Sequence, residues 1–218
     1  ILEIVDKLSQ SIGSRIKKIV LLFPTIERMS ETPNGKILTV ATRYFLPLIY
    51  LVAYLLASIV PMRLRHILVD RFFARRHQRD RPLNDNVSGT VIGMSLNFSC
   101  FRSCLFMGKD EMDKVRHLNR EAVKRNAHRL IFYYGTRDRW CPIELYESMR
   151  KYVEDFSATA EINNNNSNSN SSNVKNNKKS TELKVDDIVK LDRLNLEHGF
   201  VIHKQQCGQL ANLVNDWL

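Results

Sequence analysis

The sequence predicts an α/β fold, and three observations point to it. The run Leu130 to Tyr134 consists of five β-forming residues without a charge, which is typical of a strand buried on both faces of a parallel sheet. Two more strand-like runs, residues 16–23 and 188–191, lie on either side of it along the chain, with helical patterns between them. At 218 residues the chain is long enough to bury a substantial core.

The predicted central strand leads into a candidate catalytic loop. Gly135 ends the strand, and Asp138 then lies in the loop that leaves its carboxyl end, where ligands and catalytic groups collect in open α/β sheets. Pro142 begins a helical pattern that extends to about residue 156. Asp138 can therefore present a carboxylate to a histidine on a neighbouring loop. The alternative is that Asp138 only caps a turn.

The first part of the chain contains a serine that resembles a catalytic nucleophile. Residues 1–8 have helical spacing, residues 9–14 indicate a loop, and the strand of residues 16–23 ends before Pro24. Ser11 and Gly13 resemble part of a G-x-S-x-G nucleophile elbow, but an elbow needs a strand before its serine and a helix after it. Ser11 has the reverse order, so we predict a loop serine and not a nucleophile.

The middle of the chain indicates attachment to a membrane surface. Residues 33–35 read as a turn, and Tyr44 to Pro61 is an uncharged run near the length that spans a bilayer. A transmembrane helix, a hairpin in a monolayer and a buried lid helix all remain open for it. Residues 62–78 have the pattern of a basic amphipathic helix, which favours a membrane interface, with nucleic-acid binding or a solvated face as alternatives. The net charge of +10 suits an anionic surface or a nucleic acid.

Several remaining segments carry weaker signals. Residues 87–107 and 110–126 each read as a helix, and the Asn- and Ser-rich residues 163–180 indicate a disordered insertion. The four cysteines have no metal-ligand spacing, so the sequence predicts free thiols in a reducing compartment and no metal or cofactor.

The best histidine candidate follows the last predicted strand. His198 lies between that strand and a terminal helix, where it can take a proton from a serine while Asp138 orients its ring. An acid followed by a histidine on the last loop is the order found in α/β-hydrolases. A histidine that only hydrogen-bonds within its loop is the alternative. His203 competes for the role, but its position near a helix start predicts a surface residue.

Several of these segments together resemble the lipid-droplet-associated hydrolases. The resemblance rests on residues 21–35, on residues 132–142 with Phe132-Tyr133-Tyr134-Gly135, Asp138 and Trp140-Cys141-Pro142, and on His198 with Phe200-Val201. It covers nearly the whole chain apart from the Asn-rich tract, and Thr32 stands where family members often have a serine. The resemblance implies an α/β-hydrolase fold, hydrolysis of lipid esters including sterol esters, and residence on lipid droplets and the endoplasmic reticulum. It places the family's acid and base at Asp138 and His198.

The resemblance also implies where the nucleophile belongs. In the family, a Gly-His-Ser-Ile-Gly elbow precedes a helix and then the strand end that matches Leu21 to Ile26. Measured back from Phe23, that elbow falls just before Ile1. We therefore expect the chain to be a fragment without the nucleophile, and to be inactive alone.

The patterns and the resemblance together predict one fold with five parts. The chain is the C-terminal part of an α/β-hydrolase fold with a helical, hydrophobic lid or membrane-docking insertion. Its expected parts are the post-nucleophile helix end and next strand, the lid and membrane region, the acid-bearing core, the Asn-rich insertion, and the last strand with the His loop and terminal helix (residues 1–36, 37–107, 108–162, 163–180 and 181–218).

The expected function is serine-type hydrolysis of a lipid ester at a droplet monolayer or the endoplasmic reticulum membrane, without a nucleic-acid partner. A non-catalytic protein that organises the droplet surface is the alternative.

Overall fold

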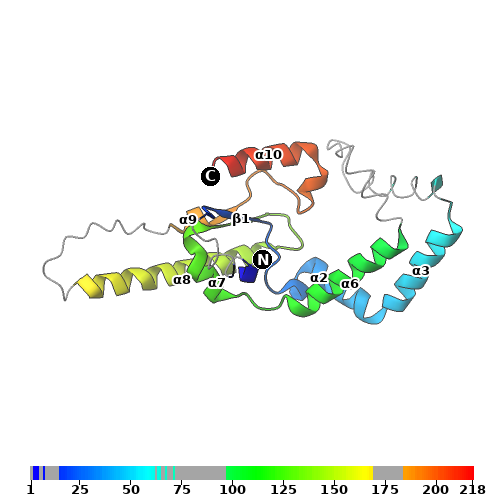
Figure 1. Cartoon of the computed structure of the whole chain (residues 1–218), viewed down its shortest axis with the longest axis horizontal. Coiled ribbons are helices and arrows are strands. Elements are labelled where there is room, and N and C mark those ends of the chain that lie inside the picture. The colour runs from blue at the N-terminus through cyan, green and yellow to red at the C-terminus, as the bar shows by residue number, and fades with distance from the viewer. Residues whose placement is uncertain are drawn as a thin grey trace. The chain divides into compact units, whose positions relative to one another are not determined.

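The computed structural model describes residues 15–61, 97–168 and 184–218, together with residues 2–4, 7, 63, 64, 67 and 71 (Figure 1). The chain divides into two compact units, and each consists of two segments. Unit 1 comprises Ile1–Ile26 and His117–Asn195, and unit 2 comprises Glu27–Arg116 and Leu196–Leu218. The predicted loop around Ser11 and most of the predicted basic helix of residues 62–78 lie outside the described residues.

A three-stranded parallel sheet forms the centre of unit 1. Its strands are β1 (Ile19–Leu22), β2 (Leu130–Tyr134) and β3 (Val189–Leu191), with β2 in the middle. All five residues of β2 are buried, as the sequence predicts for a strand covered on both faces. With the helices around it, the parallel sheet is that of an α/β fold.

The helices of unit 1 follow the strands in the order of a parallel α/β protein. They are α7 (Arg120–Asn126), the short η2 (Ala127–Arg129), α8 (Ile143–Asn168) and α9 (Val185–Ile188). In Figure 1 the long helix α8 runs from green to yellow.

The core of unit 1 lies on one face of β2. Leu130, Phe132 and Tyr134 alternate with Ile131 and Tyr133, because successive strand residues point to opposite faces. The first three belong to a buried cluster with side chains of β1, α7 and α8, which include Leu21, Val123, Met149 and Val153. Burial of each large apolar side chain of this kind contributes about 1.5–3 kcal/mol.

Two boundaries in unit 1 differ from the sequence prediction. Strand β1 begins at Ile19 and is therefore shorter than residues 16–23. Helix α8 extends to Asn168, so residues 163–168 of the predicted disordered tract are helical and the prediction was wrong for them. The helix contains no glycine or proline that would stop it.

Unit 2 is built from helices. They are η1 (Met29–Glu31), α2 (Pro33–Tyr44), α3 (Leu46–Ile59), α6 (Phe98–Lys114), η3 (Phe200–Ile202) and α10 (Lys204–Asn215). Helix α2 packs against η1 and α6, and α3 contacts α6.

The predicted turn at residues 33–35 was wrong, since these residues form the first turn of α2. The Thr32 side chain caps the helix by accepting a hydrogen bond from Gly35 N at 3.1 Å. A proline in the first helical turn is favourable because its missing N–H would have no partner there. A Cβ at Gly35 would lie 1.7 Å from the Met29 carbonyl oxygen, so this close approach requires glycine.

The uncharged run of residues 44–61 folds as α3, which lies at 87° to α2. Pro47 lies in the first turn of α3 and so does not break that helix. In the part of the chain that the structure describes, no single helix is long and apolar enough to cross a membrane. The bent pair of α2 and α3 meets that criterion together, by length and composition.

The helical residues before β2 are divided at a different point from the prediction. Helix α6 runs through the boundary expected near residues 107–110 and ends at Lys114. The next helix starts after Asn119, whose side chain accepts a hydrogen bond from Ala122 N at 3.1 Å. This cap fixes the start of α7, because asparagine is a preferred residue at a helix N-terminus.

Candidate active site

The loop after β2 holds Asp138 in one defined orientation. The side chain is 6% exposed, and its Oδ1 accepts a hydrogen bond from the backbone N–H of Trp140 at 2.7 Å. This bond is the one expected if Asp138 caps a turn. It also fixes the orientation of the carboxylate. The hydrogen bond from the backbone N–H holds this buried carboxylate in one orientation.

Gly135 sets the start of this loop. A Cβ at this position would lie 2.7 Å from Phe23 Cε1 and 3.2 Å from Asp138 Cβ. Phe23 follows β1 with a positive φ of 48°, and its N–H donates to the Tyr133 carbonyl oxygen at 2.8 Å. The Phe23 ring meets the Tyr133 ring edge to face, with 5.7 Å between centroids. The loop therefore leaves the sheet close against the Phe23 ring, and only glycine allows that approach.

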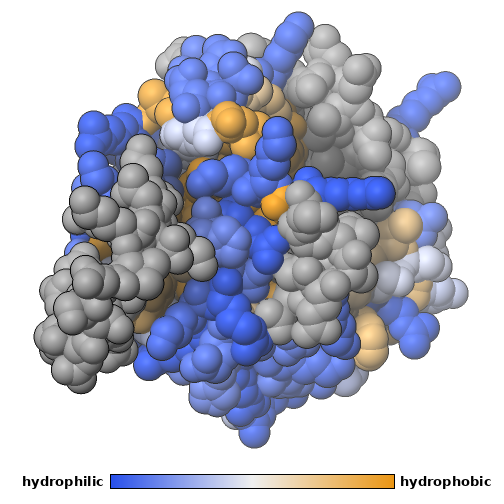
Figure 2. All heavy atoms as spheres, turned by 60° about the vertical axis from the view of Figure 1, so that its left-hand side comes forward, coloured by the Kyte–Doolittle hydropathy of each residue, from blue (hydrophilic) through white to orange (hydrophobic). Residues whose placement is uncertain are grey.

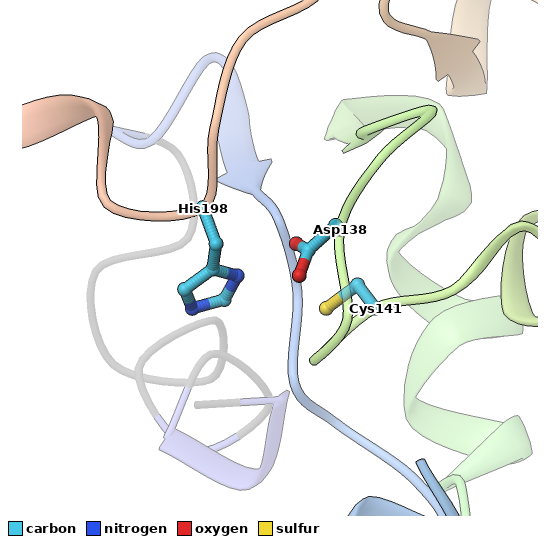
Figure 3. A group of neighbouring side chains, drawn as sticks. All are labelled: Asp138, Cys141 and His198. Carbon is cyan, nitrogen blue, oxygen red and sulfur yellow. The ribbon is translucent and has the colours of Figure 1, made fainter. Parts of the chain in front are cut away.

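Cys141 lies next to Asp138 in the same loop (Figure 3). The side chain is fully buried, and its Sγ lies within 4.8 Å of a carboxylate oxygen of Asp138. Burial raises the pKa of the Cys141 thiol well above its ordinary value, and the charge of Asp138 raises it further. Cys141 is therefore a protonated thiol.

The same contact bears on metal binding. Asp138 and Cys141 offer ligand atoms within 4.8 Å of each other. A thiol binds a metal as the thiolate, which this environment disfavours. The pair is thus poorly suited to holding a metal ion.

A second buried carboxylate follows the neighbouring strand. Asp192 comes directly after β3 and is 2% exposed. Its Oδ1 accepts hydrogen bonds from the Tyr133 hydroxyl at 2.6 Å and from Leu194 N at 2.8 Å. Burial raises the pKa of Tyr133, and the hydrogen bond to Asp192 adds to the increase. Asp192 thereby ties β3 to β2, which is a structural role.

In unit 2, His198 lies in the turn between Leu196 and η3. Leu196 is buried, His198 is half-buried, and Phe200 N donates to the Glu197 carbonyl oxygen at 2.9 Å to close the turn. The Gln206 side chain on α10 accepts a hydrogen bond from Glu197 N at 3.1 Å. These contacts hold the backbone on both sides of His198 and leave its ring partly open to solvent.

His203 was predicted at the surface, and that prediction was wrong. It is 1% exposed and precedes α10 at the N-cap position. Its Nε2 lies 3.9 Å from Glu197 Oε2. His203 is therefore a buried side chain and not a surface residue.

The two predicted site residues fall in different units, Asp138 in unit 1 and His198 in unit 2. Ser11 lies outside the described residues.

Sequence reasoning missed the contacts that hold these residues. Cys141 was named among the free thiols and in the motif of the resemblance, and its place three residues after Asp138 was the signal for a contact with that carboxylate. Asp192 carried a usable signal, because it directly follows a strand that runs parallel to β2. Gln206 has no such signal, since the pattern of α10 does not show which residue reaches back to Glu197.

The surface of the molecule is unevenly apolar. On the face drawn in Figure 2, hydrophilic side chains cover most of the coloured surface, and hydrophobic ones show as separate areas. By contrast, none of the residues of α3 is buried. Its large exposed side chains are Leu48, Leu51, Val52, Tyr54, Leu55, Leu56 and Ile59.

Comparisons with known proteins all point to the same family. A family model described as lipid-droplet associated hydrolase matches residues 1–175. A protein named lipid droplet-associated hydrolase from Drosophila melanogaster is 36% identical over 149 residues, which are 66% of this chain and 45% of that protein. The human protein of that name is 38% identical over 131 residues, 60% of this chain and 38% of that protein.

A further protein of that name, from Gallus gallus, is 30% identical over 204 residues, which are 94% of this chain and 51% of that protein. Because 204 of 218 residues are matched, this alignment runs across both Asp138 and His198. The chain spans about 38–51% of the length of these relatives. No solved structure matches. The chain belongs to the lipid-droplet associated hydrolase family.

Proposed function

We propose that this member of the lipid-droplet associated hydrolase family supplies the acid and the base, Asp138 and His198, of a serine-type esterase that acts on lipid esters, sterol esters among them. The observation that carries the proposal is the buried, oriented carboxylate of Asp138 at the carboxyl end of the central parallel strand. The names of the relatives support hydrolysis and association with lipid droplets.

The sheet topology supports the pairing. Strands β2 and β3 are adjacent and parallel, so the loops that carry Asp138 and His198 leave the same edge of the sheet. Asp138 is four residues beyond Tyr134, and His198 is seven residues beyond Leu191. Seven residues span at most about 23 Å when fully extended, so His198 has ample reach to the Asp138 loop. This order of strands and loops supports the α/β-hydrolase fold that the proposal assumes.

Each residue then has a defined chemical role. His198 takes the proton from the serine hydroxyl as that oxygen attacks the ester carbonyl, and it gives that proton to the leaving alcohol as the acyl-serine forms. It then takes a proton from the water that attacks the acyl-serine and returns it to the serine oxygen as the carboxylic acid leaves. Asp138 holds the His198 ring in the tautomer that leaves its other nitrogen free to accept that proton, and stabilises the imidazolium. In this proposal the nucleophile is a serine of the full-length protein that precedes Ile1, and Ser11 takes no part.

Kinetics of the full-length protein test the pairing. We expect Asp138→Asn and His198→Ala each to lower turnover of a lipid ester by roughly 10³- to 10⁴-fold, because triad members act as a unit. A fluorophosphonate probe should label the wild-type protein and label both variants only weakly. His203→Gln is the matched control and should retain most activity. Unchanged turnover in His198→Ala, or an equal loss in His203→Gln, would show that the wrong histidine was chosen.

Residues 1–218 alone provide a second test. We expect the purified chain to show no ester hydrolysis above background, since a histidine and an aspartate without their serine have nothing to activate. Robust turnover that Ser11→Ala abolishes would instead make Ser11 the nucleophile.

Helix α3 is the proposed contact with the lipid surface, and it acts as part of a lid or membrane dock. Its exposed apolar residues include Leu51, Leu56 and Ile59, at 54%, 52% and 73% exposure. On its other side, Tyr50 and Tyr54 pack edge to face against Phe98 of α6, with centroids 6.4 and 5.7 Å apart. A droplet monolayer or the endoplasmic reticulum membrane would remove the exposed face from water, and each buried methylene contributes about 0.8 kcal/mol.

Cationic side chains lie beside this apolar helix. Arg102 of α6 stacks on the Tyr50 ring at 5.9 Å, and Arg43 at the end of α2 stacks on Tyr44 at 5.8 Å. Arginines at the level of lipid headgroups contribute on the order of 1 kcal/mol each near an anionic surface. This arrangement supports binding at a lipid interface and not to a nucleic acid.

A reporter fusion tests the lipid contact. We expect residues 37–80 fused to a soluble fluorescent protein to move to droplets or the endoplasmic reticulum. Replacing Leu51, Leu55 and Ile59 by aspartate should release the fusion, because each charge costs about 2–3 kcal/mol in hydrocarbon. The matched control replaces the same three residues by methionine, which keeps their apolar character and should preserve targeting. A soluble wild-type fusion, or targeting that survives the aspartates, would contradict this role of α3.

The exposed apolar face of α3 favours a second candidate function as well. A non-catalytic protein that organises the droplet surface would need the same helix but no activated serine. The fluorophosphonate probe separates the two functions, because only an activated nucleophile is labelled.

A further inference from the structure

The hydrogen bond between Tyr133 and Asp192 lies where two loops leave the sheet. Tyr133 is the fourth residue of β2, and Asp192 directly follows β3. The Tyr133 hydroxyl donates to Asp192 Oδ1 at 2.6 Å, and both residues are 2% exposed. A buried bond of this length to a carboxylate is among the strong hydrogen bonds of a protein. It therefore constrains both of the chain segments that it joins.

Asp192 also shapes the turn after β3. Its N–H donates to the Tyr134 carbonyl oxygen at 2.7 Å, which continues the pairing of the strands one residue beyond β3. Its Oδ1 accepts from Leu194 N at 2.8 Å, so the chain turns back on the carboxylate. Asn195 follows with a positive φ of 60°, a conformation that asparagine tolerates better than most residues. This defined turn ends three residues before His198 in the sequence.

Tyr133 reaches the support of the acid's loop through its ring. That ring packs edge to face against Phe23, with 5.7 Å between centroids. Phe23 in turn lies against Gly135, where an added Cβ would be 2.7 Å from Phe23 Cε1. Gly135 begins the loop that carries Asp138. The ring of Tyr133 thus serves one loop and its hydroxyl serves the other.

We propose that Tyr133 and Asp192 are positioning residues for the base, because their hydrogen bond holds the turn from which the His198 loop leaves the sheet. This role goes beyond the joining of β2 and β3, since the same carboxylate oxygen also binds the turn at Leu194. The effect on catalysis rests on the proposed function, while the effect on the turn does not.

The two hydrogen bonds to Asp192 Oδ1 support each other. The Tyr133 hydroxyl holds this oxygen in the position from which it reaches Leu194 N. Without the hydroxyl, the carboxylate loses its donor on β2 and is less restrained from rotating away from the turn. Phenylalanine at position 133 would keep the ring that packs against Phe23. The substitution Tyr133→Phe therefore releases the turn and leaves the support of the acid's loop in place.

Amide hydrogen exchange in the full-length protein tests the turn without an enzyme assay. In Tyr133→Phe we expect the Leu194 amide to exchange about 10-fold faster, as expected for the loss of one hydrogen bond. The Trp140 amide, which donates to Asp138 Oδ1 at 2.7 Å, is the internal control and should keep its rate. An unchanged rate at Leu194, or an equal increase at Trp140, would overturn the proposal.

Turnover of a lipid ester by the full-length protein tests the effect on the base. Tyr133→Phe should lower kcat roughly 3- to 10-fold with little change in KM, because a misplaced base slows the proton transfers and leaves substrate binding unchanged. Asp192→Asn is the conservative variant. Its amide oxygen can accept from the same donors, so kcat should stay within about twofold of the wild type. A loss in Asp192→Asn as large as that in Tyr133→Phe would contradict the role.

Asn119→Ala is the matched control for a general loss of stability. It removes a hydrogen bond at the start of α7, in the same unit, and should leave kcat unchanged at a temperature where all variants are folded. Equal losses of kcat in Asn119→Ala and Tyr133→Phe would show an effect of stability alone and overturn the positioning role.

The two measurements fail separately. A full-length protein that hydrolyses no ester refutes the proposed function, and the exchange rate of the Leu194 amide then decides alone whether Tyr133 and Asp192 hold the turn. An active protein whose kcat is unchanged in Tyr133→Phe refutes the positioning role and leaves the triad in place.

Discussion

Substitution of Gly135 by alanine tests how the acid loop is built. The added Cβ would lie 2.7 Å from Phe23 Cε1 and 3.1 Å from Phe23 Cδ1, whereas carbon atoms in contact prefer about 3.5–4.0 Å. Phe23 is 3% exposed, so its ring has no open space to move into. On the other side, Asp138 Cβ lies 3.2 Å from the new atom. Relief of the clash therefore moves the phenylalanine ring, the acid loop, or both.

The expected loss of stability is about 1–3 kcal/mol, the typical cost of overpacking a core. Gly135 has no positive φ, so backbone conformation adds no further cost. Alanine would otherwise stabilise by about 0.4–1 kcal/mol through the unfolded state, and the clash must exceed that gain. For a protein of this size the loss corresponds to a decrease in Tm of roughly 3–10 °C.

Thermal unfolding of the full-length protein measures the effect, and a double-mutant cycle identifies its cause. Phe23→Leu removes ring atoms from the clash, so the cost of Gly135→Ala should fall by about 1 kcal/mol or more in the Phe23→Leu background. Gly208→Ala is the matched control. Gly208 lies inside α10 with no atom within 4 Å of an added Cβ, so alanine there should stabilise by about 0.5–1 kcal/mol. Strictly additive effects, or a Gly135→Ala variant as stable as the wild type, would refute this account of the loop.

Two further predictions concern stability. Tyr133→Phe removes the hydroxyl that donates to buried Asp192 and should cost about 1–3 kcal/mol at neutral pH, measured by thermal unfolding. Because the folded pKa of Tyr133 is raised above its ordinary value of 10.0, the wild type should lose stability as pH rises above that value, by up to about 1.4 kcal/mol per pH unit, and this increment should vanish in Tyr133→Phe. An alkaline profile identical in the two proteins would contradict the burial of this hydroxyl. Asn119→Ala should cost about 1 kcal/mol, since it removes the cap that accepts from Ala122 N, whereas Asn119→Asp should retain most of the stability.

The sheet was largely predictable because its strands are read from local composition. The uncharged β-forming run Leu130 to Tyr134 has one plausible structure in a parallel sheet, and it is buried throughout. Element boundaries were less predictable where one side chain decides them. The sequence predicts a turn at residues 33–35, but the Thr32 cap starts α2 there. The Asn119 cap sets the start of α7.

The position of Asp138 was predictable from the sequence, and the contacts around it were not. The order of residues alone places Asp138 in the loop at the carboxyl end of a strand, since it follows a buried strand and a glycine. The partners that hold it depend on tertiary packing, because nothing in the pattern shows that Phe23 reaches Gly135 or that the Cys141 thiol faces the carboxylate. His203 shows the same limit. Its place before a helix predicted exposure, while the structure buries it.

The central claim is that Asp138 accepts a hydrogen bond from the ring of His198, and proton NMR of the full-length protein tests it most directly. A ring N–H bonded to a buried carboxylate gives a resonance far downfield of the amide protons. We predict such a resonance in the wild type, its loss in both His198→Ala and Asp138→Asn, and its retention in His203→Gln. A downfield resonance that survives His198→Ala, or that His203→Gln removes, would contradict the pairing.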